Sequence, residues 1–198
     1  MKAFRLLLEH LDVDYTLVPR EQCCGNLLLL GASMDATGAE MLRADEVARE
    51  SLDRNLEQAR MAGAKKVIAF CAGCDLVYDR FRSSVPEEIL WYPTFMARLF
   101  RGGRLDAEVD YYAGCYYHHR KLNRSYPDLD SALTVLQRIE GLKINILDNR
   151  RCCNRPDQLS WLLDQMKSSL VVTPCAGCTT ALEKALAGTG RSVAMLPE

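Results

Sequence analysis

Apolar residues recur along the chain in two patterns, a helical one and a short continuous one. Phe4, Leu7, Leu8 and Leu11 fall on one face of a helix, which predicts a helix over residues 3–11. Short apolar runs predict buried strands, and they lie at residues 15–18, 66–70, 109–113, 143–147, 170–173 and 192–196. Further helices are predicted over residues 45–62 (ended by Gly63), 75–82, 93–100, 127–140 (ended by Gly141), 156–167 and 179–187, with a loop over 31–40.

Strands that alternate with helices predict an α/β fold with a mainly parallel sheet. The order of elements also repeats. When Cys23-Cys24 is placed on Cys152-Cys153, Ala3–Cys24 aligns with Ala132–Cys153 without a gap, and VIAFCAGC likewise matches VVTPCAGC. We therefore expect two pseudo-repeated Rossmann-like halves, 1–103 and 104–198, divided at Arg101-Gly-Gly-Arg104. The same offset places the counterpart of Cys115 before Met1, so we expect the first half to be N-terminally incomplete.

Charge and hydropathy narrow the function classes. The formal net charge is −1 and there is no long run of Lys or Arg, so we expect neither nucleic acid nor an anionic membrane surface as a partner. No window approaches the ~20 apolar residues of a membrane-spanning helix, and the N-terminus reads as an amphipathic helix instead of a signal peptide. The expected location is the cytoplasm, where structural disulfides are rare. Nine cysteines in such a chain indicate metal or redox chemistry.

The cysteines form two similar sets of candidate ligands. Each CxxC motif lies between a predicted strand and a predicted helix, where backbone N–H groups and the helix dipole favour thiolates. The candidate metal ligands are Cys23, Cys24, Cys71, Cys74, Cys115, Cys152, Cys153, Cys175 and Cys178. Three interpretations stay open: a structural zinc, a thioredoxin-like dithiol at CxxC, and an iron–sulfur cluster. The cluster explains the most, because its several irons suit five thiolates that point in different directions.

The pattern C…CC…CxxC, with Cys23-Cys24-Gly25 and Tyr112-Ala-Gly-Cys115, resembles the cysteine-rich CCG domain. That domain occurs in tandem in the catalytic B subunit of heterodisulfide reductase and in iron–sulfur subunits of glycolate and lactate oxidation. The resemblance implies a noncubane 4Fe–4S cluster in the second half, bound by Cys115, Cys152, Cys153, Cys175 and Cys178. It also implies a second cluster, or zinc, at the four cysteines of the first half. The second half departs from the family pattern, since Asn154 follows its cysteine pair where the family has glycine.

The resemblance implies an oxidoreductase subunit that is similar to this B subunit and that reduces or forms a disulfide or persulfide. Its partners would be C-like and A-like subunits of the same type of complex and a small thiol or disulfide substrate, or a sulfur carrier. We expect Cys153 to act at the reaction centre, and His118 and His119 to supply a proton to a departing thiolate. Lys65-Lys66 and Arg150-Arg151 are candidate contacts to an anionic substrate. Tyr111, Tyr112, Tyr116 and Tyr117 are candidate walls of the site.

Two alternatives are retained beside this function. One is a noncatalytic assembly module stabilised by zinc. The other is an electron-relay subunit of a 2-hydroxy-acid oxidase, which would be reduced without turning over a disulfide.

Overall fold

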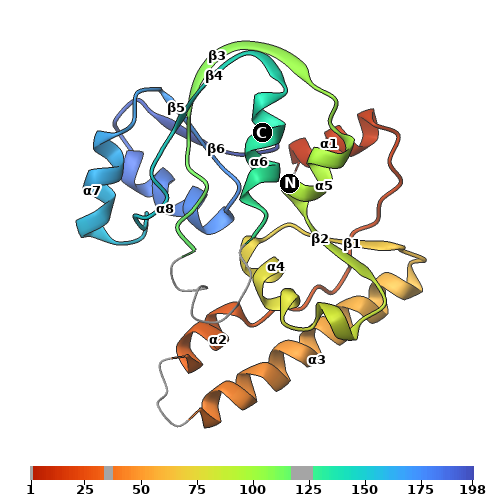
Figure 1. Cartoon of the computed structure of the whole chain (residues 1–198). Helices are drawn as coiled ribbons and strands as arrows, with labels where there is room; N and C mark the ends of the chain where they lie inside the picture. Colours follow the sequence, from red (N-terminus) through yellow and green to blue (C-terminus); the bar gives the residue numbers. More distant parts are fainter. Residues whose placement is uncertain (1, 34–37, 117–126) are drawn as a thin grey trace. The chain divides into compact units, whose positions relative to one another are not determined.

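The computed structural model describes residues 2–33, 38–116 and 127–198, and the chain forms two compact units (Figure 1). Unit 1 comprises the described parts of Met1–Asp12, Pro93–Tyr117 and Asp128–Glu198. Unit 2 comprises those of Val13–Tyr92 and His118–Pro127. Both are built from parallel strands and helices, which confirms the predicted α/β class.

Unit 1 holds a four-stranded parallel sheet in the order β4-β3-β5-β6. Its elements are α1 (Lys2–His10), α5 (Tyr92–Leu99, from its second residue), β3 (Gly103–Tyr111), α6 (Leu129–Gln137), β4 (Ile139–Ile146), α7 (Pro156–Asp164), β5 (Leu170–Thr173), α8 (Ala176–Leu186) and β6 (Ser192–Met195). The connection through α6 leads from β3 to β4, toward one edge of the sheet. The connections through α7 and α8 lead to β5 and β6, toward the other edge. Because such crossovers are right-handed, α6 covers one face and α7 and α8 the other, as Figure 1 shows.

The centre of this sheet is where the strand order changes direction, between β3 and β5. In open α/β sheets, ligands bind outside the carboxyl ends of the strands at such a point. The last three residues of each of these strands are buried, as expected for a strand covered on both faces. The chain therefore directs the residues after Tyr111 and after Thr173 to the same edge.

Unit 2 pairs β1 (Lys66–Ala69) with β2 (Glu88–Trp91) in parallel. Its helices are α2 (Asn26–Ala32), α3 (Ala39–Met61) and α4 (Ala72–Asp79), followed by the short 3-10 helix η1 (Arg82–Ser84). The apolar sides of these helices pack with Ala69 and Ile89 in one core. Gly63 follows α3 with φ 72°, the left-handed conformation predicted for it.

The pseudo-repeat is visible in strand register. Lys66 pairs with Glu88 and Leu170 with Ser192, so the paired strands are 22 residues apart in each unit. Each pair is joined by a helix that begins just after the first cysteine of CxxC. The two CxxC motifs thus occupy equivalent positions in equivalent βαβ segments.

Several element predictions were wrong in detail. Residues 15–18 form no strand. Their counterpart in unit 1 is β4, which pairs with β3, but no described strand of unit 2 pairs with residues 15–18. Residues 31–32 belong to α2, whose four consecutive leucines gave no helical period. Gly141 does not end a helix: it lies inside β4 with φ 84°, opposite an irregularity in β3 where a Cβ would collide with Asp106. No helix in the described residues is long and apolar enough to cross a membrane.

Candidate cysteine site

Unit 1 brings its five cysteines to the carboxyl ends of three neighbouring strands. Cys115 lies four residues after the end of β3, the cysteine pair follows β4, and Cys175 is the N-cap of α8. Four of the five are buried, and Cys175 is partly exposed. Parallel pairing of β4, β3 and β5 accounts for this gathering, because it aligns the ends of the three strands.

The five thiols of unit 1 form a group of three and a pair. Cys178 hydrogen-bonds with both Cys153 and Cys175. Cys152 contacts Cys115 instead. The adjacent cysteines of the pair therefore point to different neighbours, as expected for a CC dipeptide.

Hydrogen bonding and burial set the acidity of these thiols in opposite directions. The hydrogen bond from Cys178 lowers the pKa of Cys153, while donation to its two neighbours raises the pKa of Cys178 well above the ordinary value. Burial raises the pKa of Cys152 to about 11. Among Cys152, Cys153 and Cys178, Cys153 is the thiol whose pKa is lowered, so its environment favours the negative charge.

Unit 2 repeats the group of three but not the pair. Cys74 hydrogen-bonds with Cys24 and Cys71, lowering the pKa of both; the pKa of Cys71 falls to about 6. The same bonds raise the pKa of Cys74. Cys23, the counterpart of Cys152, is exposed.

Backbone N–H groups at helix starts face the cysteine sulfurs. The N–H of Asn26, at the start of α2, donates to Cys24, and the N–H groups of Gly73 and Cys74, in the first turn of α4, donate to Cys71. The N–H of Asn154 donates to Cys152 shortly before α7. These donors lie at the positive ends of helix dipoles, so they favour thiolates over thiols.

Amide side chains hold the loops that carry both cysteine pairs. Asn55 on α3 accepts from the backbone N–H of Gln22 (2.8 Å) and donates to its carbonyl (2.9 Å). In unit 1 the Gln158 side chain on α7 accepts from the N–H of Cys152 (2.7 Å). Neither residue was predicted from the sequence, and Gln158 alone had a local signal, as the third residue of a predicted helix that begins at Pro156.

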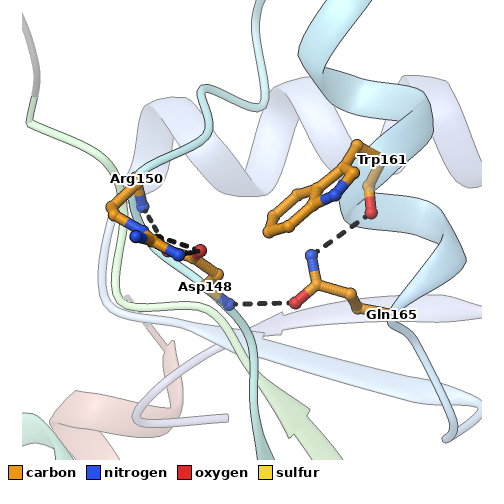
Figure 2. Close-up of polar contacts among 4 residues, drawn as sticks. All are labelled: Asp148, Arg150, Trp161 and Gln165. Atoms are coloured by element: carbon orange, nitrogen blue, oxygen red, sulfur yellow. Dashed lines mark hydrogen bonds and ion pairs between the residues drawn. The ribbon is translucent and has the colours of Figure 1, made fainter.

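The loop between β4 and the cysteine pair is tied to α7, as Figure 2 shows. Gln165 accepts from the backbone N–H of Asp148 (3.4 Å) and donates to the carbonyl of Trp161 (3.2 Å). Arg150 forms an ion pair with Asp148, while the Arg151 guanidinium lies 4.9 Å from the centre of the Trp161 ring. Arg150 is therefore neutralised, and Arg151 is the member of the predicted cationic pair that is held beside Cys152 by an aromatic ring.

The remaining predicted residues are placed as follows. Lys66 forms an ion pair with Glu88 on the neighbouring strand (2.7 Å). Tyr111, Tyr112 and Tyr116 are buried. Burial, and then the charges of four cysteines of unit 1, raises the pKa of Tyr112. His118, His119 and Tyr117 lie outside the described residues.

The donor set fits an iron–sulfur centre in its chemistry. Thiolates are soft ligands that select iron–sulfur clusters, zinc or copper(I). No three His, Cys, Asp or Glu side chains in residues 2–33, 38–116 and 127–198 are arranged as a ready group that could hold a metal ion. The thiols of unit 1 instead form two separate contacts, a group of three and a pair. Such a division suits a centre with several metal positions better than one tetrahedral ion.

Comparison with known proteins finds relatives among the subunits of heterodisulfide reductase. The chain is 29% identical over 164 residues to the D subunit of dihydromethanophenazine:CoB--CoM heterodisulfide reductase of Methanosarcina mazei, and 28% identical over 158 residues to that of Methanosarcina barkeri. Each match covers 74% of this chain but 37% of the relative, so the chain spans well under half the length of these relatives. The relatives are D subunits, whereas the resemblance in the sequence pointed to the B subunit. No solved structure matches the chain.

The family comparison covers both halves of the chain. The model of the cysteine-rich domain, CCG, matches residues 1–78 and 109–162, more than half of the 198 residues. These matches include both cysteine pairs, Cys115 and the first CxxC motif. The chain therefore belongs to the CCG cysteine-rich domain family.

Proposed function

We propose that the chain is the iron–sulfur subunit of a heterodisulfide reductase-type complex, and that it reduces or forms a disulfide or persulfide of a small thiol or sulfur carrier. The observation that carries the proposal is the five-thiol group of unit 1 at the switch point of its sheet. Curated relatives named as heterodisulfide reductase subunits support the reaction class. The role of a B-like subunit belongs to this proposal, beside the D-subunit name that the relatives carry.

In this proposal five residues hold a noncubane 4Fe–4S cluster: Cys115, Cys152, Cys153, Cys175 and Cys178. When bound, such a cluster supplies single electrons to a sulfur atom of the substrate. The chain contributes burial of the thiols, a hydrogen bond that lowers the pKa of Cys153, and backbone donors at helix starts. Cys153 is our candidate for the reaction centre for that reason. His118 and His119 stay our candidates for proton donors.

Unit 2 is proposed to hold a second metal centre at Cys23, Cys24, Cys71 and Cys74. Its group of three thiols repeats that of unit 1, which favours a cluster of the same general type. Four cysteines are also the ligand set of a structural zinc. The exposed position of Cys23 does not decide between an iron–sulfur cluster and a zinc ion. Metal analysis distinguishes the two.

Electron delivery is proposed to come from partner subunits, a C-like iron–sulfur protein and an A-like flavoprotein. We place the complex in the cytoplasm.

Metal and sulfide analysis of anaerobically purified and reconstituted protein tests the proposal. About four irons and four acid-labile sulfides per chain would indicate one 4Fe–4S centre, and about eight of each would indicate two. Cys153→Ser should remove the unit 1 centre and its EPR signal, and Cys24→Ser, at the equivalent position of unit 2, should leave that signal in place. Stoichiometric zinc without sulfide would overturn the proposal in favour of an assembly module. A cluster that is reduced by dithionite, but never oxidised by a disulfide substrate, would favour the relay of a 2-hydroxy-acid oxidase.

A further inference from the structure

The Tyr112 side chain is fully buried among the cysteines of unit 1. Its backbone N–H donates to the carbonyl of Val172 (2.9 Å), which places it beside the end of β5. Its ring belongs to the same apolar core as Cys153 and Cys178. A tyrosine phenol has an ordinary pKa of about 10, so it is a neutral hydrogen-bond donor at physiological pH.

The Tyr112 hydroxyl hydrogen has two acceptors within reach. It donates to the carbonyl of Arg151 at 2.6 Å, and the same hydroxyl is in hydrogen-bond contact with the sulfur of Cys153. A phenol carries one hydrogen, so at any moment it serves one acceptor fully. The acceptor with more negative charge holds it more strongly.

A buried tyrosine occupies a related position in unit 2. Tyr78 lies in one core with Cys24 and Cys74, and its hydroxyl oxygen accepts from Asn55 Nδ2 (3.0 Å). The same amide nitrogen donates to the carbonyl of Gln22, the residue before Cys23. In both units a tyrosine hydroxyl is thus linked to the carbonyl of the residue before the cysteine pair, directly in unit 1 and through Asn55 in unit 2. The tyrosine of unit 1 directly follows β3, whereas that of unit 2 lies on α4. A link that recurs from different places in the fold indicates a role at the cysteines beyond packing.

We propose that Tyr112 is a positioning residue of the unit 1 centre, whose hydroxyl hydrogen shifts from the Arg151 carbonyl toward the Cys153 sulfur when that sulfur gains negative charge. The proposal rests on the iron–sulfur function proposed above. No covalent bond forms or breaks: an electron from an external reductant adds charge to the centre, and the hydrogen bond follows that charge. A hydrogen bond to a ligand sulfur stabilises the more reduced state, so Tyr112 raises the reduction potential of the centre.

Two substitutions of opposite effect separate this role from a purely structural one. Tyr112→Phe removes the donor and keeps the ring, so the potential should fall. Tyr112→3-fluorotyrosine keeps the hydroxyl and makes it a stronger donor, so the potential should rise. If Tyr112 merely anchored the loop at Arg151, loss of the anchor would change stability, and a stronger donor would leave the potential unchanged or lower it.

Tyr111→Phe is the matched control. Tyr111 is the neighbouring residue on β3, it is equally buried, and its hydroxyl has no hydrogen-bond partner among the described residues. The charges that act on it come from Asp130 and Asp128, not from cysteines. Its removal should therefore leave the potential of the centre where it is.

The experiment is a dithionite titration of the reconstituted protein, followed by EPR, with iron and sulfide measured for every variant. Opposite shifts for the two Tyr112 variants, with no shift for Tyr111→Phe, are the expected result. Wild-type protein that binds iron and sulfide but shows one potential in all variants overturns this inference alone. Wild-type protein that binds no iron overturns the proposed function and the inference with it. Should Tyr112→Phe fail to bind a cluster, the fluorotyrosine variant still decides: an upward shift supports the inference, and an unchanged potential overturns it.

Discussion

The side chain of Asn55 binds both backbone groups of Gln22, across 33 residues of sequence. Three residues along the same helix, Gln58 does the same for Arg20: it accepts from the backbone N–H (3.0 Å) and donates to the carbonyl (3.1 Å). Two amide side chains one turn apart thus pair with the backbones of alternate residues, Arg20 and Gln22. This pairing holds the segment that leads into Cys23-Cys24.

Asn55→Ala should destabilise the chain and loosen the segment before Cys23. The side chain is buried, and its loss leaves the Gln22 backbone and the Tyr78 hydroxyl short of partners, at a cost of about 2–3 kcal/mol. Gln58→Ala removes an equivalent pair of bonds at a more exposed site and should cost less than about 1 kcal/mol. Hydrogen exchange of the peptide that contains residues 20–24, with chemical denaturation, measures both. Equal effects for the two variants would show that burial of Asn55 is not what matters.

Asp110→Asn should be among the most damaging single changes in unit 1. The Asp110 carboxylate is fully buried on β3 and accepts from Asn145 Nδ2 and from the backbone N–H groups of Lys167 and Ser168. An amide turns one acceptor into a donor that faces other donors, which should cost about 3 kcal/mol or more. Glu108→Gln, two residues earlier on β3, removes an exposed ion pair with Lys143 and should cost less than about 1 kcal/mol. Denaturation midpoints of the two variants that lie close together would contradict this.

The strands of the repeat that precede each CxxC motif could be predicted because they are local sequence patterns. Leu170–Thr173 forms β5 with the predicted bounds, and Lys66–Ala69 forms β1 with one residue fewer than expected. Both are apolar runs followed by CxxC, and no distant contact is needed to recognise them. The division of the repeat after residue 103 stays a prediction.

Local patterns failed where a distant partner decides the structure. Residues 15–18 have the composition of a strand, but a strand needs a neighbour, and the segment before Cys23 is held instead by side chains of α3. Glu88–Trp91 was not predicted, although it forms β2, because a four-residue strand with one exposed end shows little alternation. Leu27–Leu30 has no period at all. Its helix exposes Leu27 and buries Leu29 against the core of unit 2, a choice that only the packed structure reveals.

The cysteines of the candidate site could be named from the sequence, whereas the residues that support them could not. Thiolate chemistry and the positions of the CxxC motifs were readable, because cysteine spacing is local. The grouping of the thiols, with Cys178 between Cys153 and Cys175, and the contacts of Tyr112 depend on how strand ends align. No spacing rule predicts these.

The reactivity of Cys71 in the cofactor-free chain should depend on pH in an unusual range. The hydrogen bond from Cys74 is the largest cause of the lowered pKa of Cys71, about 6 against the ordinary 9.0, and the N–H groups of α4 add to it against the effect of burial. Because the pKa is lowered, the thiolate is present above pH 6 and lost below it. Alkylation of this exposed residue by iodoacetamide should therefore rise through pH 6 and level off before pH 8.

Cys74→Ala provides the control for that profile. Without its hydrogen bond the inflection should move toward 9.0. At pH 7 the thiolate fraction falls by up to ~90-fold, and the higher nucleophilicity of a more basic thiolate recovers about 20-fold, so the rate should drop roughly fivefold. Peptide mass mapping assigns the alkylated residue. The same inflection in both proteins would show that Cys74 does not set the acidity of Cys71.

The two CAGC motifs should respond differently to the same substitution. A Cβ added at Gly73 would lie 2.9 Å from Asn26 Nδ2 and 3.0 Å from its Cγ, whereas at Gly177 the nearest atom is the sulfur of Cys175 at 3.8 Å. Gly73→Ala should therefore push the Asn26 side chain away from the cysteines of unit 2, at a net cost of about 1–2 kcal/mol. Gly177→Ala should be neutral or stabilising by about 0.5 kcal/mol, since alanine favours the helix.

Asn26→Ala tests whether the collision is the cause. The Asn26 Oδ1 atom is buried with no hydrogen-bond partner among the described residues, so truncating the side chain removes an unsatisfied acceptor together with the obstacle. In the double variant Asn26→Ala/Gly73→Ala, the second substitution should cost less than about 0.5 kcal/mol, a coupling of about 1 kcal/mol or more. Denaturation of the four proteins of this cycle measures that coupling. Additive effects would mean that Gly73 is needed for the backbone of α4 itself, and then Gly177→Ala should be as damaging as Gly73→Ala, because both glycines occupy the same position of the repeat.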